Sequence, residues 1–231
     1  MSVADLGSRT WPEVDAHGRG LVLAVPLGAC EQHGPHLPLQ TDTLIAVAIA
    51  EAAAAERRDV VIAPALPYGA SGEHAGFPGT LSAGTEVLAA YVTELVRSAR
   101  SWSRAVVVVS GHGGNADALE RVARSAEDDG DVVVIFFPSV AGGDAHAGRT
   151  ETSLVLALRE GLVRHNEAVI GNLAPLPELA SRLRAEGVAS ASASGVLGDP
   201  TGATAAEGRA LLGAIAADLF AAVDGALGDG P

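Results

Sequence analysis

The stretch GACEQHGPHLPLQTDT, which begins at residue 28, concentrates side chains that can bind metals or move protons. Glu31 and His33 are two residues apart, so both project to the same side of an extended chain, whereas a helix would separate them. The prolines of this stretch exclude a helix across it. Asp42 comes where the next helix is expected to begin, and there it could cap that helix or offer an oxygen to a cation. These residues therefore predict several polar groups that face one point.

Two later loops hold further candidates. His112 lies in SGHGGN directly after an apolar run, where the glycines let the backbone approach a ligand closely. Asn115 could donate to an oxyanion or cap the helix that follows. In DAHAGRTETS, His146 is followed by Glu151, which we expect in the first turn of a helix. The helix dipole favours a carboxylate there, so helix capping is the simpler role for Glu151 when it is considered alone.

Two imidazoles and three carboxylates form the candidate ligand set, namely Glu31, His33, Asp42, His112 and Glu151. A mixed set of nitrogen and oxygen ligands suits Zn, Mn or Fe(II) better than Ca or Mg. Five ligands are too many for one tetrahedral zinc with an open position, but they suit two ions that share a carboxylate. Such a pair of divalent ions would activate water and polarise a carbonyl group.

The hydrophobic pattern predicts the elements that position these groups. Strand-like apolar runs cover 21–28, 60–69, 105–111 and 132–138, and helical stretches cover 43–58, 85–100 and 116–128, with further helices after residue 150. Buried strands that alternate with helices predict βαβ units and a parallel sheet covered on both faces. We therefore expect a single α/β domain over residues 1–231 with at least four parallel strands. Ligand sites in such sheets lie beyond the carboxyl ends of the strands, where all the polar loops are found.

The composition of the chain excludes several classes of function. The chain has 231 residues, of which 48% are hydrophobic, and this is typical of a globular protein. The net charge of −13 argues against nucleic acid as a partner. All basic residues are arginine, which excludes a lysine Schiff base and a P-loop lysine. No uninterrupted apolar run reaches the ~18 residues of a membrane span, and the start does not resemble a signal peptide. We expect a cytoplasmic protein without a membrane partner, and a single cysteine fits a reducing compartment.

Several other polar residues have two interpretations each. Cys30 is either a nucleophile or a buried structural thiol. Glu73 and His74 lie in a glycine-rich loop, where they either contact a substrate or are solvated. Asp199 either borders the pocket or belongs to a simple turn. His36 is either a ligand or a loop histidine that bonds to the backbone, and it is left out of the ligand set.

The motifs, taken in order, resemble the creatininase family of amidohydrolases. The matching segments are EQHGPHLPLQTD (31–42), EHAGFPGT (73–80), GHGGN (111–115), HAGRTETS (146–153) and GVLGDPTGAT (195–204). The resemblance implies a three-layer α/β/α domain, a binuclear metal centre, hydrolysis of C–N amide bonds and a homo-oligomer. It also implies that Asp42 bridges two metal ions, that Glu31, His33, His112 and Glu151 complete their ligands, and that His146 carries a proton to the leaving nitrogen.

One position departs from creatininase itself, which has a metal-binding glutamate two residues after the histidine of the GH motif. This chain has Gly114 there. The resemblance therefore implies that Glu151 completes the second ion, and it favours a substrate other than creatinine. The segments are most similar to a branch of the family that releases a modified Val-Tyr dipeptide from the C-terminus of a precursor peptide.

The substrate implied by this resemblance is a modified precursor peptide, and another small cyclic or linear amide is the alternative. Two further classes stay open. GHGGN could be the phosphate loop of a nucleotide- or cofactor-binding protein, or the chain could bind metal without catalysing a reaction.

Overall fold

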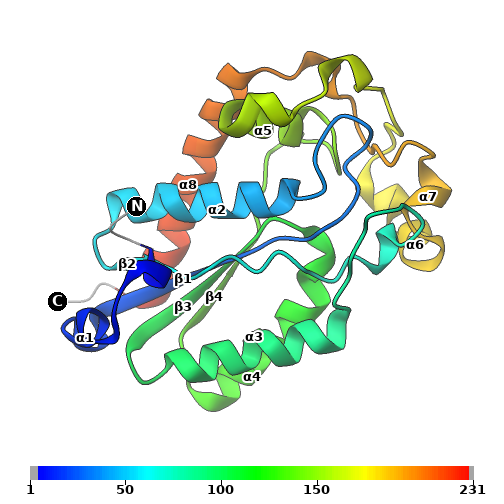
Figure 1. The fold of residues 1–231 in the computed structure, drawn as a ribbon. Helices are drawn as coiled ribbons and strands as arrows, with labels where there is room; N and C mark the ends of the chain where they lie inside the picture. The colour runs from blue at the N-terminus through cyan, green and yellow to red at the C-terminus, as the bar shows by residue number, and fades with distance from the viewer. Residues whose placement is uncertain (1–4, 229–231) are drawn as a thin grey trace.

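The computed structural model describes residues 5–228, which form a four-stranded sheet with helices on both faces (Figure 1). The strands are β1 (Leu21–Leu27), β2 (Val60–Ile62), β3 (Ser103–Ser110) and β4 (Val133–Phe136). Their order in the sheet is β2-β1-β3-β4, and every neighbouring pair is parallel. The predicted α/β fold with a parallel central sheet is confirmed.

Strand β2 is much shorter than the predicted strand over 60–69. Its ladder with β1 ends at Ile62, because the next residue of β1 that would donate to β2 is Pro26, which has no N–H for the Ala63 carbonyl. The chain nevertheless stays beside β1, since the N–H of Leu66 donates to the Pro26 carbonyl at 2.9 Å. The loop after β2 therefore still begins at the same edge of the sheet as the other polar loops.

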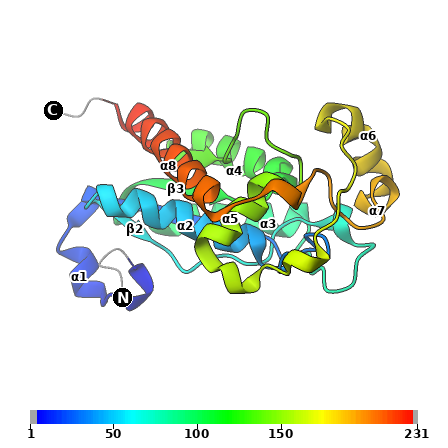
Figure 2. The ribbon, with the colours of Figure 1, turned by 90° about the horizontal axis from the view of Figure 1, so that it is seen from above.

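Helices cover both faces of the sheet as the apolar pattern predicts. On one face lie α2 (Thr41–Glu56), α5 (Arg149–Arg159) and α8 (Ala205–Leu227), and on the other lie α3 (Thr85–Ala99) and α4 (Ala116–Asp129). Figure 2 shows the first three side by side. Alternate strand residues point to opposite faces, so Val22 packs under α2 while Leu23 packs under α3.

The smaller helices lie at the two ends of the sheet. Helix α1 (Trp11–Asp15) lies beside the amino ends of the strands, and α6 (Leu176–Glu186) and α7 (Val188–Ala191) lie beyond their carboxyl ends (Figure 1). Among the described residues, α8 is the one helix long and apolar enough to cross a membrane by length and composition. Its buried side chains Ile215 and Leu219 belong to the core under α2, so in this fold α8 forms part of one helical layer.

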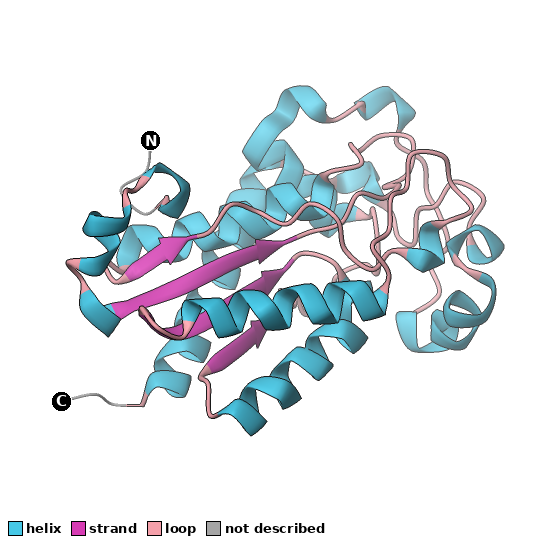
Figure 3. Ribbon diagram, turned by 60° about the horizontal axis from the view of Figure 1, so that its bottom comes forward, coloured by secondary structure: helices cyan, strands magenta, loops and turns pink. Residues whose placement is uncertain are grey.

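The strands all point toward one group of loops, as the arrows in Figure 3 show. Helix α2 begins at Thr41, two residues before the predicted helix, and α5 begins at Arg149. Asp42 and Glu151 are therefore in the first turns of their helices. Both helices start at the carboxyl end of the sheet, where the histidine loops also lie.

Candidate metal centre

The predicted ligands come together at the carboxyl ends of β1 and β3. Potential ligand atoms lie within 4.8 Å of one another in three overlapping groups, Glu31–Asp42–His112, His33–Asp42–Glu151 and Glu31–His33–His146. We refer to the first as the His112 group and to the second as the His33 group. Asp42 belongs to both, which is the arrangement expected of a carboxylate shared by two ions. Except for the half-buried Glu151, all these side chains are buried.

Two glycines allow Asp42 to reach the centre. A Cβ atom on Gly111 would lie 2.2 Å from the backbone oxygen of Asp42, and one on Gly28 would lie 2.5 Å from the Cα of Thr43. Such distances are too short for a real side chain. The first turn of α2 therefore packs directly on the backbone at the ends of β1 and β3, and this contact places Asp42 between the other ligands.

Interatomic distances show how the side chains face one another. His33 Nε2 lies 3.0 Å from Asp42 Oδ1 and 3.8 Å from Glu151 Oε2. His112 Nδ1 lies 3.1 Å from Glu31 Oε1 and 3.6 Å from Asp42 Oδ2. Each imidazole thus presents one nitrogen to two carboxylates, and these facing atoms are the ones that a cation would contact.

The carboxylates of the centre are incompletely satisfied. Both oxygens of Glu31 and Oδ2 of Asp42 are buried and have no aligned hydrogen bond within residues 5–228. Glu31 is fully buried, and Asp42 is 1% exposed. A buried charge without partners is costly, and paired charges or bound metals normally compensate it. Imidazole nitrogens with carboxylate oxygens also match the ligand preferences of Zn, Mn and Fe(II). The residues therefore fit divalent cations.

Burial and charge together shift the pKa values of this centre. Burial alone would lower the pKa of His33, but Asp42 and Glu151 outweigh it and raise this pKa to about 10. Burial likewise opposes the charge on His112, while Glu31 and Glu73 hold its pKa well above the usual value. For Asp42, burial prevails and raises the pKa to about 6. At neutral pH the metal-free centre thus keeps protons on the nitrogens that a metal would need.

The ring of His146 packs against the rings of His33 and His74, with centroids 4.3 Å and 4.6 Å apart. Its Nε2 is 2.8 Å from the backbone oxygen of Gln32, and its Nδ1 is 3.9 Å from Glu31 Oε1. The side-chain nitrogen of Gln32 also lies 2.9 Å from this Nε2, but its two hydrogens have acceptors on His74 and Gly195. Because the Gln32 carbonyl oxygen can only accept, we assign the proton to Nε2 and the lone pair to Nδ1. Burial lowers the pKa of His146, so its ring is neutral near pH 7. A neutral imidazole whose free nitrogen faces the centre is suited to proton transfer.

The residue after His146 has an unusual backbone conformation. Ala147 is the one non-glycine residue in the described chain with a positive φ, at 52°. Its N–H donates to Glu151 Oε2 at 2.6 Å. This hydrogen bond joins the His146 loop to the first turn of α5.

Asn115 does not have the predicted free donor. Its amide nitrogen hydrogen-bonds to the Gly28 carbonyl at 3.3 Å and to Ser110 Oγ at 3.2 Å, and its oxygen accepts from the Ala70 N–H at 2.8 Å. Both amide hydrogens are thus used within the protein, and its side chain does not cap α4. The structure assigns Asn115 to joining three loops, and this corrects the oxyanion role.

Two residues that the sequence left ambiguous lie beside the centre. His74 is 4% exposed, so its interpretation as a solvated loop residue is wrong. Its Nε2 is 3.3 Å from Glu31 Oε1, and Glu73 Oε1 is 3.3 Å from His112 Nε2. Gln32, which received no role from the sequence, hydrogen-bonds to His74. The sequence signal for this position beside the centre was that Glu73 and His74 lie in a loop that follows a strand, as the other candidate residues do.

The other ambiguous residues have local roles. His36 is fully buried but bonds to Thr152 Oγ1 at 3.0 Å and is in none of the ligand groups. The Cys30 thiol is half-buried and contacts the Gly79 carbonyl at 3.7 Å. Asp199 accepts from the N–H of Thr201, as expected of a turn.

The GHGGN loop has the wrong electrostatic surroundings for a phosphate loop. Its histidine faces three carboxylates, those of Glu31, Asp42 and Glu73. Like charges repel, so these groups disfavour a nucleotide phosphate at this place. The interpretation as a nucleotide-binding loop is therefore not supported.

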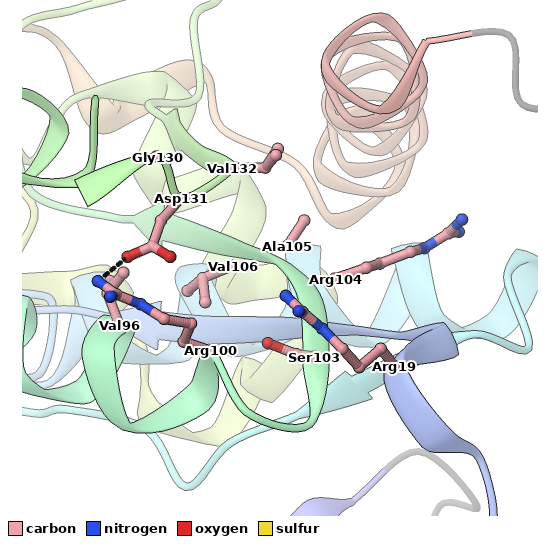
Figure 4. A pocket seen from close by; sticks show the side chains of 10 residues that line it. All are labelled: Arg19, Val96, Arg100, Ser103, Arg104, Ala105, Val106, Gly130, Asp131 and Val132. Atoms are coloured by element: carbon pink, nitrogen blue, oxygen red, sulfur yellow. Dashed lines mark hydrogen bonds and ion pairs between the residues drawn. The ribbon is translucent and has the colours of Figure 1, made fainter. Parts of the chain in front are cut away.

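A shallow pocket lies at the opposite end of the sheet, at the start of β3 (Figure 4). Arg19, Arg100 and Arg104 contribute to its lining. Arg100 is paired with Asp131 at 2.7 Å, and Arg104 is paired with Asp59. Carboxylates thus neutralise two of these three arginines, whereas the unsatisfied buried groups gather at the carboxyl end of the sheet.

Comparison with known proteins identifies the family. The family model described as creatininase, or creatinine amidohydrolase, matches residues 7–223. The chain belongs to the creatininase family. It is 49% identical over 198 residues to the mycofactocin precursor peptide peptidase of Mycolicibacterium smegmatis, across 84% of this chain and 80% of that protein. It is 46% identical over 225 residues to the protein of the same name from Mycobacterium tuberculosis H37Rv, across 94% of this chain and 89% of the relative.

More distant members of the family share the fold. Creatinine amidohydrolase of Pseudomonas putida is 33% identical over 190 residues, across 68% of this chain and 73% of that protein. A crystal structure of creatininase matches with a TM-score of 0.80 and 26% identity, across 96% of this chain and 97% of that one. A manganese form of creatininase matches with a TM-score of 0.78. The family is one of metal-dependent hydrolases, so this protein is a hydrolase with candidate metal-binding groups.

Proposed function

We propose that this protein is a metal-dependent peptidase that cleaves the mycofactocin precursor peptide and releases its modified C-terminal Val-Tyr dipeptide. The relatives named for this precursor are more similar to the chain than the creatinine amidohydrolase of Pseudomonas putida is. The observation that best supports hydrolysis is the pair of buried ligand groups that share Asp42 and contain unsatisfied carboxylate oxygens.

Two divalent ions, of Zn, Fe(II) or Mn, would be held by the two groups. Glu31, Asp42 and His112 would hold one ion, and His33, Asp42 and Glu151 would hold the other. When bound, such ions lower the pKa of water and polarise a substrate carbonyl. The groups lie at the ends of rigid strands and helices, which keeps the ligands in place.

His146 would transfer the proton that the reaction must move. As the oxygen of water attacks the peptide carbonyl, Nδ1 of His146 accepts a proton from that water. When the C–N bond breaks, His146 gives this proton to the leaving nitrogen. The products are a carboxyl terminus and the free amine of the dipeptide. The hydrogen bond from Nε2 to the Gln32 carbonyl keeps the ring oriented for both steps.

Chelation and reconstitution test this function. The metal-free protein is loaded separately with Zn, Mn or Fe(II) and assayed with the modified precursor peptide and with creatinine. We expect metal-dependent release of the dipeptide. Hydrolysis of creatinine without peptide cleavage would instead favour a small-amide substrate, and metal binding without either reaction would favour a non-catalytic protein. The homo-oligomeric state and the cytoplasmic location stay predictions.

A further inference from the structure

A single turn of 3-10 helix, η3 (Gly72–His74), reaches one half of the candidate centre. Its two neighbouring side chains contact two different members of the His112 group. Glu73 Oε1 lies 3.3 Å from His112 Nε2, and His74 Nε2 lies 3.3 Å from Glu31 Oε1. Neither side chain belongs to a ligand group, and each contacts a residue that does.

Glu73 occupies space that Gly114 leaves free. A Cβ atom on Gly114 would lie 2.2 Å from Glu73 Oε1 and 2.3 Å from His112 Nε2. The absence of a side chain at 114 thus admits a carboxylate from a loop about forty residues earlier in the chain. Nε2 of His112 faces both Glu73 and the backbone oxygen of Ala70, at 3.3 Å from each.

These contacts determine which nitrogen of His112 is available. Because both acceptors lie on the Nε2 side, the proton of a neutral ring stays on Nε2 and the lone pair is on Nδ1. Nδ1 is the nitrogen that faces Glu31 and Asp42. A carboxylate that holds the second nitrogen of a ligating histidine fixes its ring and makes it a better ligand.

His74 is oriented in turn by Gln32. The side-chain oxygen of Gln32 accepts from the Gly34 N–H at 2.8 Å, which fixes the orientation of the amide. Its nitrogen then donates to the Gly195 carbonyl at 3.1 Å and to His74 Nδ1 at 2.9 Å. Since Nδ1 of His74 accepts a hydrogen bond, the ring proton is on Nε2 and points at the Glu31 carboxylate.

The His33 group is held by different elements. The Ala147 N–H donates to Glu151 Oε2, and His33 Nδ1 lies 3.2 Å from the Glu31 backbone oxygen. Neither contact involves η3. The two halves of the centre therefore have separate supports, although they share Asp42.

We propose that η3 is the positioning element of the His112 group alone, with Glu73 orienting the ring of His112 and His74 orienting the carboxylate of Glu31. This inference rests on the proposed two-ion centre. Loss of the Glu73 carboxylate should weaken metal binding at this one position by about 10–100-fold. Binding at the His33 group should stay unchanged.

Titration of the full-length metal-free protein with Co²⁺, followed by calorimetry and visible absorption, tests this inference. The Glu73→Gln variant removes the charge and keeps the shape of the side chain, and His74→Gln is a second variant. Glu127→Gln, an exposed position on α4, is the matched control. We expect one of two binding steps to weaken in Glu73→Gln and in His74→Gln, and both steps to match wild type in the control.

The Glu151→Gln variant shows which binding step belongs to which group. It should weaken only the step of the His33 group, so a Glu73→Gln/Glu151→Gln double variant should weaken both steps. Equal weakening of both steps by Glu73→Gln, or no weakening at all, would overturn the positioning role. Failure of the wild-type protein to bind two ions would instead contradict the proposed function. Thermal unfolding of each metal-free variant checks that the fold is intact.

Discussion

Replacing Gly111 with alanine should damage the centre without touching a ligand. The added Cβ would lie 2.2 Å from the backbone oxygen of Asp42 and 3.1 Å from its Cα. The atom in the way belongs to the backbone of α2, so no side-chain rotation can relieve the contact. Either the end of β3 or the first turn of α2 must move.

The size of this movement follows from the distance. Real Cβ contacts are essentially never below 3.0 Å, so the contact must lengthen by about 0.8 Å. A misplacement of about 1 Å in a catalytic group can cost about 100-fold in rate. Overpacking in a tight interior costs about 1–3 kcal/mol of unfolding free energy. We therefore expect Gly111→Ala to lose about 100-fold in turnover and to bind metal more weakly, while it remains folded.

Gly113→Ala is the matched control for this change. Gly113 lies in the same loop, and apart from its own neighbours in the chain an added Cβ would have no atom within 4 Å among the described residues. Its unfolding free energy should stay within about 0.5 kcal/mol of wild type. The assay compares peptide hydrolysis, bound metal by elemental analysis and thermal unfolding for the two variants. Equal turnover and metal content in both would refute the view that close backbone packing places Asp42.

Three further predictions concern individual side chains. His146→Ala should reduce peptide hydrolysis by about 10²–10⁴-fold while elemental analysis finds the wild-type metal content; an unchanged rate would exclude the proton-transfer role. The pKa of His33 is about 10 without metal, and a ligating nitrogen must lose its proton before it binds a metal ion. The affinity for metal should therefore fall by about tenfold per pH unit for each displaced proton as the pH is lowered from roughly 8.5 to 6.5. Calorimetry in buffers of different ionisation enthalpy measures this release, and an affinity independent of pH would contradict it. Asn115→Ala should lower the unfolding free energy by about 1–3 kcal/mol through its three lost hydrogen bonds; a variant with wild-type stability and a rate reduced 10²-fold or more would restore the oxyanion role.

Much of the fold could be predicted because its signals are local. Continuous apolar runs such as Leu21–Leu27 identify buried strands, and the rule for parallel sheets then places the polar loops at one edge. The end of β2 was missed because the apolar run over 60–69 outweighed its prolines in the prediction. Pro26 of β1 decides that end, since it has no N–H to donate to β2.

The site was predictable where one motif determines the geometry, as for Glu31 and His33. Contacts between loops that are distant in the chain could not be predicted from the sequence. The approach of Glu73 to His112 depends on the missing side chain at Gly114 and on the path of the loop after β2. Asn115 likewise finds its three partners in separate segments, so no local spacing could distinguish a structural amide from a catalytic one.

The left-handed conformation of Ala147 links metal binding by Glu151 to proton transfer by His146. An alanine in this region is strained by about 1–2 kcal/mol, and the charged oxygen of Glu151 that accepts its N–H offsets this cost. The same peptide segment contains the imidazole of His146. If the Glu151 carboxylate is lost, Ala147 can relax to an ordinary conformation and the adjacent ring turns with it. A defect at a metal ligand would then also misalign the proton carrier, so substitutions at the two sites should not have additive effects.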